Sequence, residues 1–285
     1  MTGTSDRADP LRILQLSDSH LLGDGRRHYD RVDTTEALRR VLNWAGAIGS
    51  IDLVAATGDL SDDGSEASYR LLYELLEPWA AARGAATAYL MGNHDQPAGF
   101  EAVLGAREGV TTVAGRRIIR LDTSVAGAAY GDLDDRQLDG LRSVLATPAE
   151  HGSVLLLHHP PLPAVSPLLG ALQLRDPAAL LEICAAGDIR VILCGHYHHP
   201  LAGRAGGVEV FVAPGIANTT DVIAPAGHEI ARIGSGFALL EIPTAATEPV
   251  RWMPIAVAGP DDGTVIFDLP PDRVQQIAAE YGPPR

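Results

Sequence analysis

The sequence lacks lysine altogether, so all 22 basic residues are arginine. This absence excludes chemistry that needs an amine side chain, including Schiff-base formation and the phosphate-binding lysine of a P-loop. The two cysteines, Cys184 and Cys194, are too few for a disulfide framework and do not have the spacing of a zinc finger. An anionic substrate would therefore have to be held by arginine, by metal ions or by backbone N–H groups.

Long apolar runs are lacking too. No segment approaches the ~18 apolar residues of a membrane-spanning helix, and the polar residues 1–10 show no secretory signal. The 22 basic and 36 acidic residues give a net charge of −14, which disfavours binding to nucleic acid polymers and to anionic membranes. We expect a cytoplasmic protein that acts on a small molecule.

Composition and pattern indicate an α/β protein. The chain has 285 residues, of which 46% are hydrophobic and 20% charged, as in ordinary globular proteins. We expect a single domain over residues 1–285, with a core at about 11–245 and a strand and helix extension at about 246–285. Short apolar runs alternate with helical patterns, which favours an α/β fold. A strand-rich final third indicates a second sheet.

The expected elements follow from hydrophobic periodicity. Helices are expected at 33–48, 65–82 (broken near Pro78), 133–145, 176–186 and 271–281. Strands are expected at 11–16, 51–57, 86–91, 117–122, 153–157, 189–194, 208–212, 237–242, 250–258 and 264–267. Residues 160–175 are proline-rich and are expected to form a loop that shapes a pocket. Residues 246–285 could form a sheet edge, a dimer contact or a lid.

Five of these strands end in polar groups that can bind a metal ion. The groups are Asp18 and His20, Asp59, Asn93 and His94, His158, and His196 and His198. Because ligand sites of open α/β sheets form at the carboxyl ends of strands, we expect the five endings to converge at one edge. The set mixes carboxylates, an amide and imidazoles without any thiolate, which argues against a structural zinc cage. Seven ligands are enough for two ions that share one carboxylate.

The stretches that contain these residues resemble the calcineurin-like metallophosphoesterase superfamily. Its motifs correspond to D18-x-H20, G58-D59, G92-N93-H94-D95, H158 and G195-H196-x-H198. Within the superfamily, LSDSHLLG, TGDLSDDG, MGNHDQ, RIIRLDTSVAG, LHHPPLP and LCGHYHH are most similar to class III cyclic nucleotide phosphodiesterases. The resemblance covers roughly residues 11–215. It implies a four-layer α/β/β/α sandwich of two mixed β-sheets flanked by helices, with two metal ions.

The resemblance also implies a role for each matching residue. Asp18, His20 and His198 would hold the first ion, Asn93, His158 and His196 the second, and Asp59 would bridge both. His158 is preferred over His159 because it comes first after its strand. Iron and manganese are the expected metals, with zinc, cobalt or magnesium as alternatives.

The implied reaction is hydrolysis of a small phosphodiester by a metal-bridging hydroxide. His94 would protonate the leaving group, and Asp62 would orient His94. Cyclic nucleotides such as 3′,5′-cAMP or cGMP, or 2′,3′-cyclic nucleotides, are the expected substrates. The alternative substrates are glycerophosphodiesters, phosphonate esters, nucleoside pyrophosphates and phosphomonoesters. A protein that senses a nucleotide without cleaving it is the alternative function. The chain could also form a homodimer.

Overall fold

The first of two large β-sheets has the strand order β13-β12-β1-β2-β3. The computed structural model describes residues 10–284. The strands of this sheet are β1 (Leu11–Leu16), β2 (Leu53–Thr57), β3 (Ala86–Leu90), β12 (Ser235–Ile242) and β13 (Arg251–Val257). β1, β2 and β3 are parallel, whereas β12 and β13 add antiparallel pairs. The carboxyl ends of the three parallel strands therefore share one edge.

The second sheet has the order β4-β5-β6-β7-β9-β8. Its strands are β4 (Gly109–Val113), β5 (Arg116–Arg120), β6 (Ser153–Leu156), β7 (Ile189–Cys194), β8 (Leu201–Ala205) and β9 (Val208–Val212). β5, β6, β7 and β9 are parallel, and the two outer strands are antiparallel to their neighbours.

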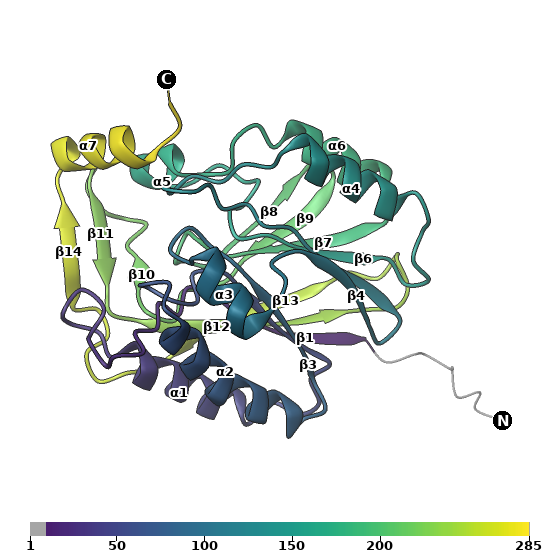
Figure 1. Ribbon diagram of the computed structural model, residues 1–285, viewed down its shortest axis with the longest axis horizontal. Helices are drawn as coiled ribbons and strands as arrows, with labels where there is room; N and C mark the ends of the chain where they lie inside the picture. The colour runs from purple at the N-terminus through teal and green to yellow at the C-terminus, as the bar shows by residue number, and fades with distance from the viewer. Residues whose placement is uncertain (1–9, 285) are drawn as a thin grey trace.

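The two sheets pack face to face, and helices cover their outer faces (Figure 1). Successive side chains of a strand point to opposite faces, so Ile13 of β1 joins the core between the sheets while Leu14 faces helices. The helices over the first sheet are α1 (Thr34–Ala45) and α2 (Glu66–Ala81), with α3 (Pro97–Leu104) against α2. Those over the second sheet are α4 (Asp135–Leu145) and α6 (Ala178–Ala186). The expected α/β/β/α sandwich is confirmed.

A third, small sheet lies beside the sandwich, at the left of Figure 1. It contains β10 (Thr219–Thr220), β11 (Glu229–Arg232) and β14 (Val265–Leu269), with the order β10-β11-β14. Helices α5 (Pro167–Ala171) and α7 (Pro271–Tyr281) pack against each other above it. The extension therefore supplies a sheet edge, β13, and also one strand and one helix of this additional layer.

Two local expectations were wrong. Helix α2 runs through Pro78 without a break. Its buried positions continue on both sides, at Leu76 and Ala80, and tertiary packing of an apolar face outweighs a locally poor helix residue. The expected loop at 160–175 contains α5, where Ser166 caps the helix by accepting a hydrogen bond from the N–H of Leu169 and proline occupies the first turn.

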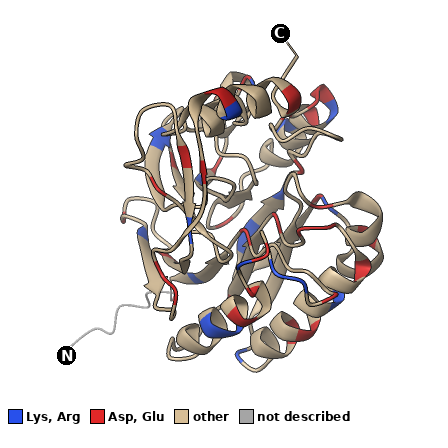
Figure 2. Cartoon of the chain, turned by 90° about the vertical axis from the view of Figure 1, so that its left-hand side faces the viewer, with Lys and Arg blue, Asp and Glu red and all other residues tan. Residues whose placement is uncertain are grey.

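Basic and acidic residues occur throughout the chain. In the view of Figure 2, positions of Arg (blue) and of Asp and Glu (red) both occur along the helices and loops. Several of them pair locally, as do Arg26 with Asp24 and Arg142 with Asp139. Such exposed pairs contribute little to stability. Among residues 10–284, no helix is both long enough and apolar enough to cross a membrane.

Candidate metal centre

The loops after five parallel strands meet at one edge of the sandwich. The loops after β1 and β2 run side by side, because the N–H of Asp18 donates to the carbonyl of Gly58 at 3.0 Å and that of His20 to the carbonyl of Asp59 at 2.9 Å. The N–H of His196, in the loop after β7 of the other sheet, donates to the Asp18 carboxylate at 3.1 Å. Residues of both sheets therefore contribute to one site.

Asp59 lies at the centre of this edge. Its Oδ2 is 3.4 Å from Nε2 of His158 and 3.6 Å from Nε2 of His20. Its Oδ1 accepts a hydrogen bond of 2.9 Å from the N–H of His94. The carboxylate of Asp59 thus has histidine rings from both sheets around it.

A second contact group surrounds Asp18. Nε2 of His198 lies 3.4 Å from Oδ1 of Asp18 and 3.3 Å from Nε2 of His20. One ligand atom from each of Asp18, His20, Asp59 and His198 falls within 4.8 Å of the others. Ligand atoms this close together can bind a single cation.

Outer hydrogen bonds fix the orientation of three of the rings. Nδ1 of His158 donates to the carbonyl of Thr57 at 2.8 Å, and Nε2 of His196 donates to the carbonyl of Leu172 at 3.0 Å. Nδ1 of His20 lies 3.2 Å from Oδ1 of Asp62. When one ring nitrogen donates outward, the other presents a lone pair inward, as in histidines that bind metal ions.

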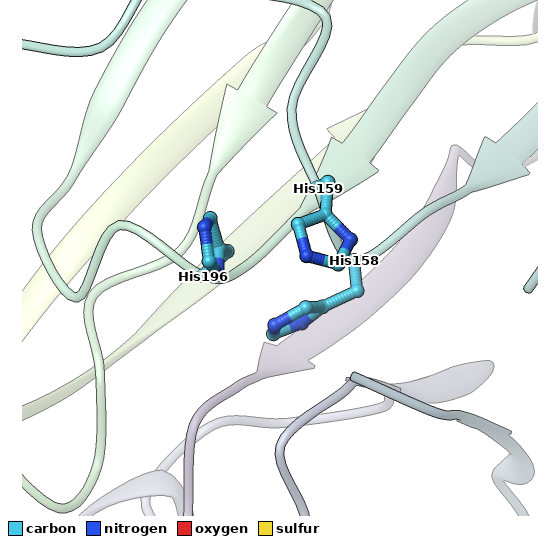
Figure 3. Close-up of side chains that lie close together, drawn as sticks. All are labelled: His158, His159 and His196. Atoms are coloured by element: carbon cyan, nitrogen blue, oxygen red, sulfur yellow. The ribbon is translucent and has the colours of Figure 1, made fainter. Parts of the chain in front are cut away.

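His158, His159 and His196 form a cluster of three rings, shown in Figure 3. The ring centroids of His159 and His196 are 4.4 Å apart. His159 uses both nitrogens for protein contacts, at 2.8 Å from Oγ1 of Thr123 and 3.3 Å from the carbonyl of Ala129. Nε2 of His158, in contrast, faces Asp59. Of the two neighbouring histidines, His158 is therefore the one with a nitrogen free for a cation.

The backbone is strained at this edge. Five of the residues have a positive φ: Asp18 (53°), His20 (42°), Asp59 (49°), His196 (71°) and His198 (53°). Such angles are unfavourable for residues other than glycine and concentrate at functional sites. Gly92 allows close approach, since a Cβ there would lie 2.3 Å from Oδ1 of Asp59. The backbone thus adopts unfavourable φ angles at the positions where the polar side chains come together.

The donor set fits metal ions. Oδ1 of Asn93 and Nε2 of His158 are buried without a hydrogen-bond partner, and an unsatisfied buried polar atom costs about 1–3 kcal/mol. One cation could satisfy both atoms, and a second could bind between Nε2 of His20 and Nε2 of His198, which lie 3.3 Å apart. These residues could therefore hold metal ions through oxygen and nitrogen.

Burial and charge set the protonation of the rings. Burial lowers the pKa of His20 and of His198 to about 4, so both are neutral and able to bind a cation at pH 7. Burial opposes a charge on His158, but Asp59 and Asp18 outweigh it and raise the pKa of His158 to about 9. The negative field that stabilises a proton on that ring would equally stabilise a metal ion.

Asp62 connects three imidazoles beside the cluster. Its carboxylate lies 3.2 Å from Nδ1 of His20, 3.2 Å from Nδ1 of His28 and 3.4 Å from Nδ1 of His94. Burial opposes ionisation of Asp62, but these imidazoles outweigh it and hold its pKa well below the usual range. Burial also opposes a charge on His94, yet Asp59 and Asp62 raise the pKa of His94 to about 9.

Two contributors were not identified from the sequence. The side chain of Asp95 accepts hydrogen bonds from the backbone N–H groups of Leu60, Ser61 and Gly92, at 3.1, 3.0 and 2.8 Å, and so ties two site loops together. Its place directly after G-N-H was the available signal. His28, which belongs to none of the motifs, is buried against Asp62.

A cavity of about 710 Å³ opens over this edge. Its floor includes His20, Asp59, Asn93 and His94. Its walls come from α5, the third sheet and α7, with apolar side chains such as Leu172. A volume of this size accommodates a small organic ligand.

The fold and the gathered side chains define a class: an α/β/β/α protein with clustered oxygen and nitrogen ligands where its two sheets meet. The chain belongs to the calcineurin-like phosphoesterase family, which residues 11–200 match. The resemblance stated from the motifs is therefore confirmed, and the chain is a member of a family of hydrolases.

Several curated proteins are similar to this chain. A cAMP/cGMP dual specificity phosphodiesterase of Mycobacterium tuberculosis is 39% identical over 231 residues, which cover 78% of this chain and 73% of that protein. A probable cyclic nucleotide phosphodiesterase of Rhodococcus erythropolis is 38% identical and covers 78% and 76%. A 3′,5′-cyclic adenosine monophosphate phosphodiesterase of Escherichia coli K12 is 35% identical and covers 67% and 70%.

Solved structures share the fold at low sequence identity. A dimetal phosphatase from Danio rerio superposes with a TM-score of 0.58 at 14% identity, covering 88% of this chain and all of that one. A purple acid phosphatase from yellow lupin gives 0.57 at 13% identity, covering 98% and 57%.

Proposed function

We propose that this protein is a phosphodiesterase with two metal ions that hydrolyses small phosphodiesters, with cyclic nucleotides as its substrates. The observation behind this proposal is the gathering of His20, Asp59 and His198 at the floor of a cavity of about 710 Å³, with Asp18 buried directly beside them. The names of the relatives from M. tuberculosis, R. erythropolis and E. coli support the substrate class.

The ligand assignment that we propose is the one that the motifs imply, and the contact group of Asp18, His20, Asp59 and His198 supports its first part. Asp18, His20 and His198 would hold one ion. Asn93, His158 and His196 would hold the other, and Asp59 would serve both. Iron and manganese suit this mixture of carboxylate, amide and imidazole, and zinc, cobalt or magnesium are the alternatives.

Bound ions would neutralise the phosphodiester oxygens and lower the pKa of water. His94 would supply the proton for the leaving group, and Asp62 would orient the ring of His94. The side chain of His94 lines the cavity and is 39% exposed, and its raised pKa keeps it protonated at pH 7. It can therefore donate a proton to the departing alkoxide. Asp62, 3.4 Å from Nδ1 of His94, would hold the ring so that Nε2 carries the transferable proton.

A small substrate fits the rest of the molecule better than a polymer. The net charge is −14. Long nucleic acids need basic side chains to neutralise their phosphates, and a strongly acidic protein repels them.

The test is a substrate panel in the presence of Mn²⁺. We expect turnover of 3′,5′-cAMP, 3′,5′-cGMP or 2′,3′-cyclic nucleotides, abolished by a chelator and restored by Mn²⁺. The panel also contains a glycerophosphodiester, a phosphonate ester, a nucleoside pyrophosphate and a phosphomonoester. Turnover confined to one of those four compounds would show that its class, and not cyclic nucleotides, is the substrate. If no ester in the panel is hydrolysed in a metal-dependent way, the proposal is wrong. An Asp59→Asn variant controls for contaminating activity.

A further inference from the structure

One face of the third sheet forms a wall of the cavity. Alternate residues of a strand share a face, and in β14 these are Phe267 and Leu269, which pair with Ala231 and Glu229 of β11. All four line the cavity that contains the candidate metal centre. Of these four side chains, only that of Glu229 is polar.

An aromatic pair stands at one end of this wall. The ring of Tyr29 packs edge-on against Phe267, with centroids 5.1 Å apart and planes at 67°. Tyr29 lines the cavity, is 52% exposed and has a left-handed φ of 50°. Residues held at a positive φ concentrate at functional sites. His28, which precedes it and is in ring contact at 4.3 Å, anchors this turn to Asp62.

A buried carboxylate stands at the other end. Glu229 is 4% exposed, and its Oε2 accepts a hydrogen bond from the hydroxyl of Ser166. Leu269 faces it across the strand pair, two residues from Phe267, which corresponds to about 7 Å along the strand. Burying a carboxylate among apolar groups is costly unless hydrogen-bond donors reach it. A ligand with N–H groups would supply further donors from the cavity side.

We propose that this wall is a nucleobase subsite, in which the base stacks on the ring of Tyr29, packs edge-on against Phe267 and presents its N–H edge to Glu229. This inference rests on the proposed function and adds to it the part of the substrate that is recognised. Stacking on an aromatic ring accepts any base. A carboxylate favours guanine, because guanine has two adjacent N–H donors on its pairing edge where adenine has one donor beside an acceptor.

Equilibrium binding separates the base from the phosphate. Calorimetry on the Mn²⁺-loaded protein measures the Kd of 5′-GMP, 5′-AMP and ribose 5-phosphate, which share the phosphate and differ in the base. We expect wild-type protein to bind both nucleotides more tightly than ribose 5-phosphate, and 5′-GMP more tightly than 5′-AMP. Equal binding of all three would overturn the subsite.

Variants then assign the contacts. Tyr29→Ala should raise the Kd of both nucleotides by about 10-fold, the loss expected for one stacked base, and leave that of ribose 5-phosphate unchanged. Tyr29→Phe retains the ring and should bind as wild type. Glu229→Gln preserves an acceptor for Ser166 and should weaken 5′-GMP while leaving 5′-AMP near its wild-type value.

A purely structural role gives a different pattern. If Glu229 only supports Ser166, Glu229→Gln will leave the ratio of the GMP and AMP constants unchanged, which would overturn its role as base acceptor. If Tyr29→Ala weakens ribose 5-phosphate as much as the nucleotides, the stacking role is wrong. Base-dependent binding without any phosphodiester turnover would leave the subsite standing and remove the proposed function. Turnover of cyclic nucleotides together with equal binding of the three ligands would support the proposed function and overturn the subsite.

Discussion

Nε2 of His158 lies 3.4 Å from Oδ2 of Asp59, and this contact joins the two large sheets. Asp59 follows β2 of the first sheet, and His158 follows β6 of the second. Two glycines make the approach possible, because a Cβ on Gly58 would lie 2.3 Å from Nδ1 of His158 and one on Gly92 would lie 2.3 Å from Oδ1 of Asp59. The geometry of the site therefore depends on how the sheets pack.

The two neighbouring histidines give the first prediction. His158→Gln should lose one of the two metal ions, because Nε2 of His158 is buried without a hydrogen-bond partner and faces Asp59. His159→Gln should retain both ions, because both of its nitrogens already contact protein groups. Elemental analysis of the purified variants measures the metal content. The assignment is wrong if the loss occurs in the His159 variant instead.

If His94 is the proton donor that we propose, the loss of rate in a His94 variant should depend on the leaving group. His94→Ala should slow hydrolysis of a diester with an alkoxide leaving group by about 10²–10⁴-fold, the usual contribution of a general acid. A p-nitrophenyl diester should be affected far less, because p-nitrophenolate departs without protonation. Comparing kcat for the two substrates is the measurement. An equal loss on both would show that His94 acts in some way other than proton donation.

Close approach at Gly92 predicts a sharp effect of one methyl group. Gly92→Ala should reduce activity by about 10²-fold or more, since the new Cβ would displace Asp59 and His158 from their positions. Gly140 is the matched control, because it lies within α4 and its Cβ would meet nothing within 4 Å. Gly140→Ala should leave activity unchanged and raise the free energy of unfolding by about 0.5–1 kcal/mol. Enzyme assays and urea unfolding test the pair.

The cysteines should be unreactive in the folded protein. Burial raises the pKa of Cys184 to about 12 and that of Cys194 well above its usual range, so neither forms the reactive thiolate near neutral pH. A thiol-reactive chromogenic disulfide should label neither residue under native conditions and both after unfolding in guanidinium. Rapid labelling of the native protein would indicate that α6 or β7 opens locally.

The sequence predicted the elements whose patterns are long and regular. Helix α7 begins and ends where expected, at Pro271 and Tyr281, and β7 likewise extends from Ile189 to Cys194. It missed the short strands β4, β8, β10 and β11 and the short helices α3 and α5. Such short segments have no period to detect, and only contacts with distant parts of the chain stabilise them.

The family, the presence of two sheets and the polar residue types at the strand ends could be predicted from the sequence, because they follow from local pattern and from motif spacing. Which atoms face one another was set by the tertiary fold. It placed Asp62 among three imidazoles, directed Nε2 of His158 rather than His159 toward Asp59, and set the third sheet as a wall of the cavity. Those relations depend on packing between segments that are distant in the sequence, and no local pattern encodes that packing.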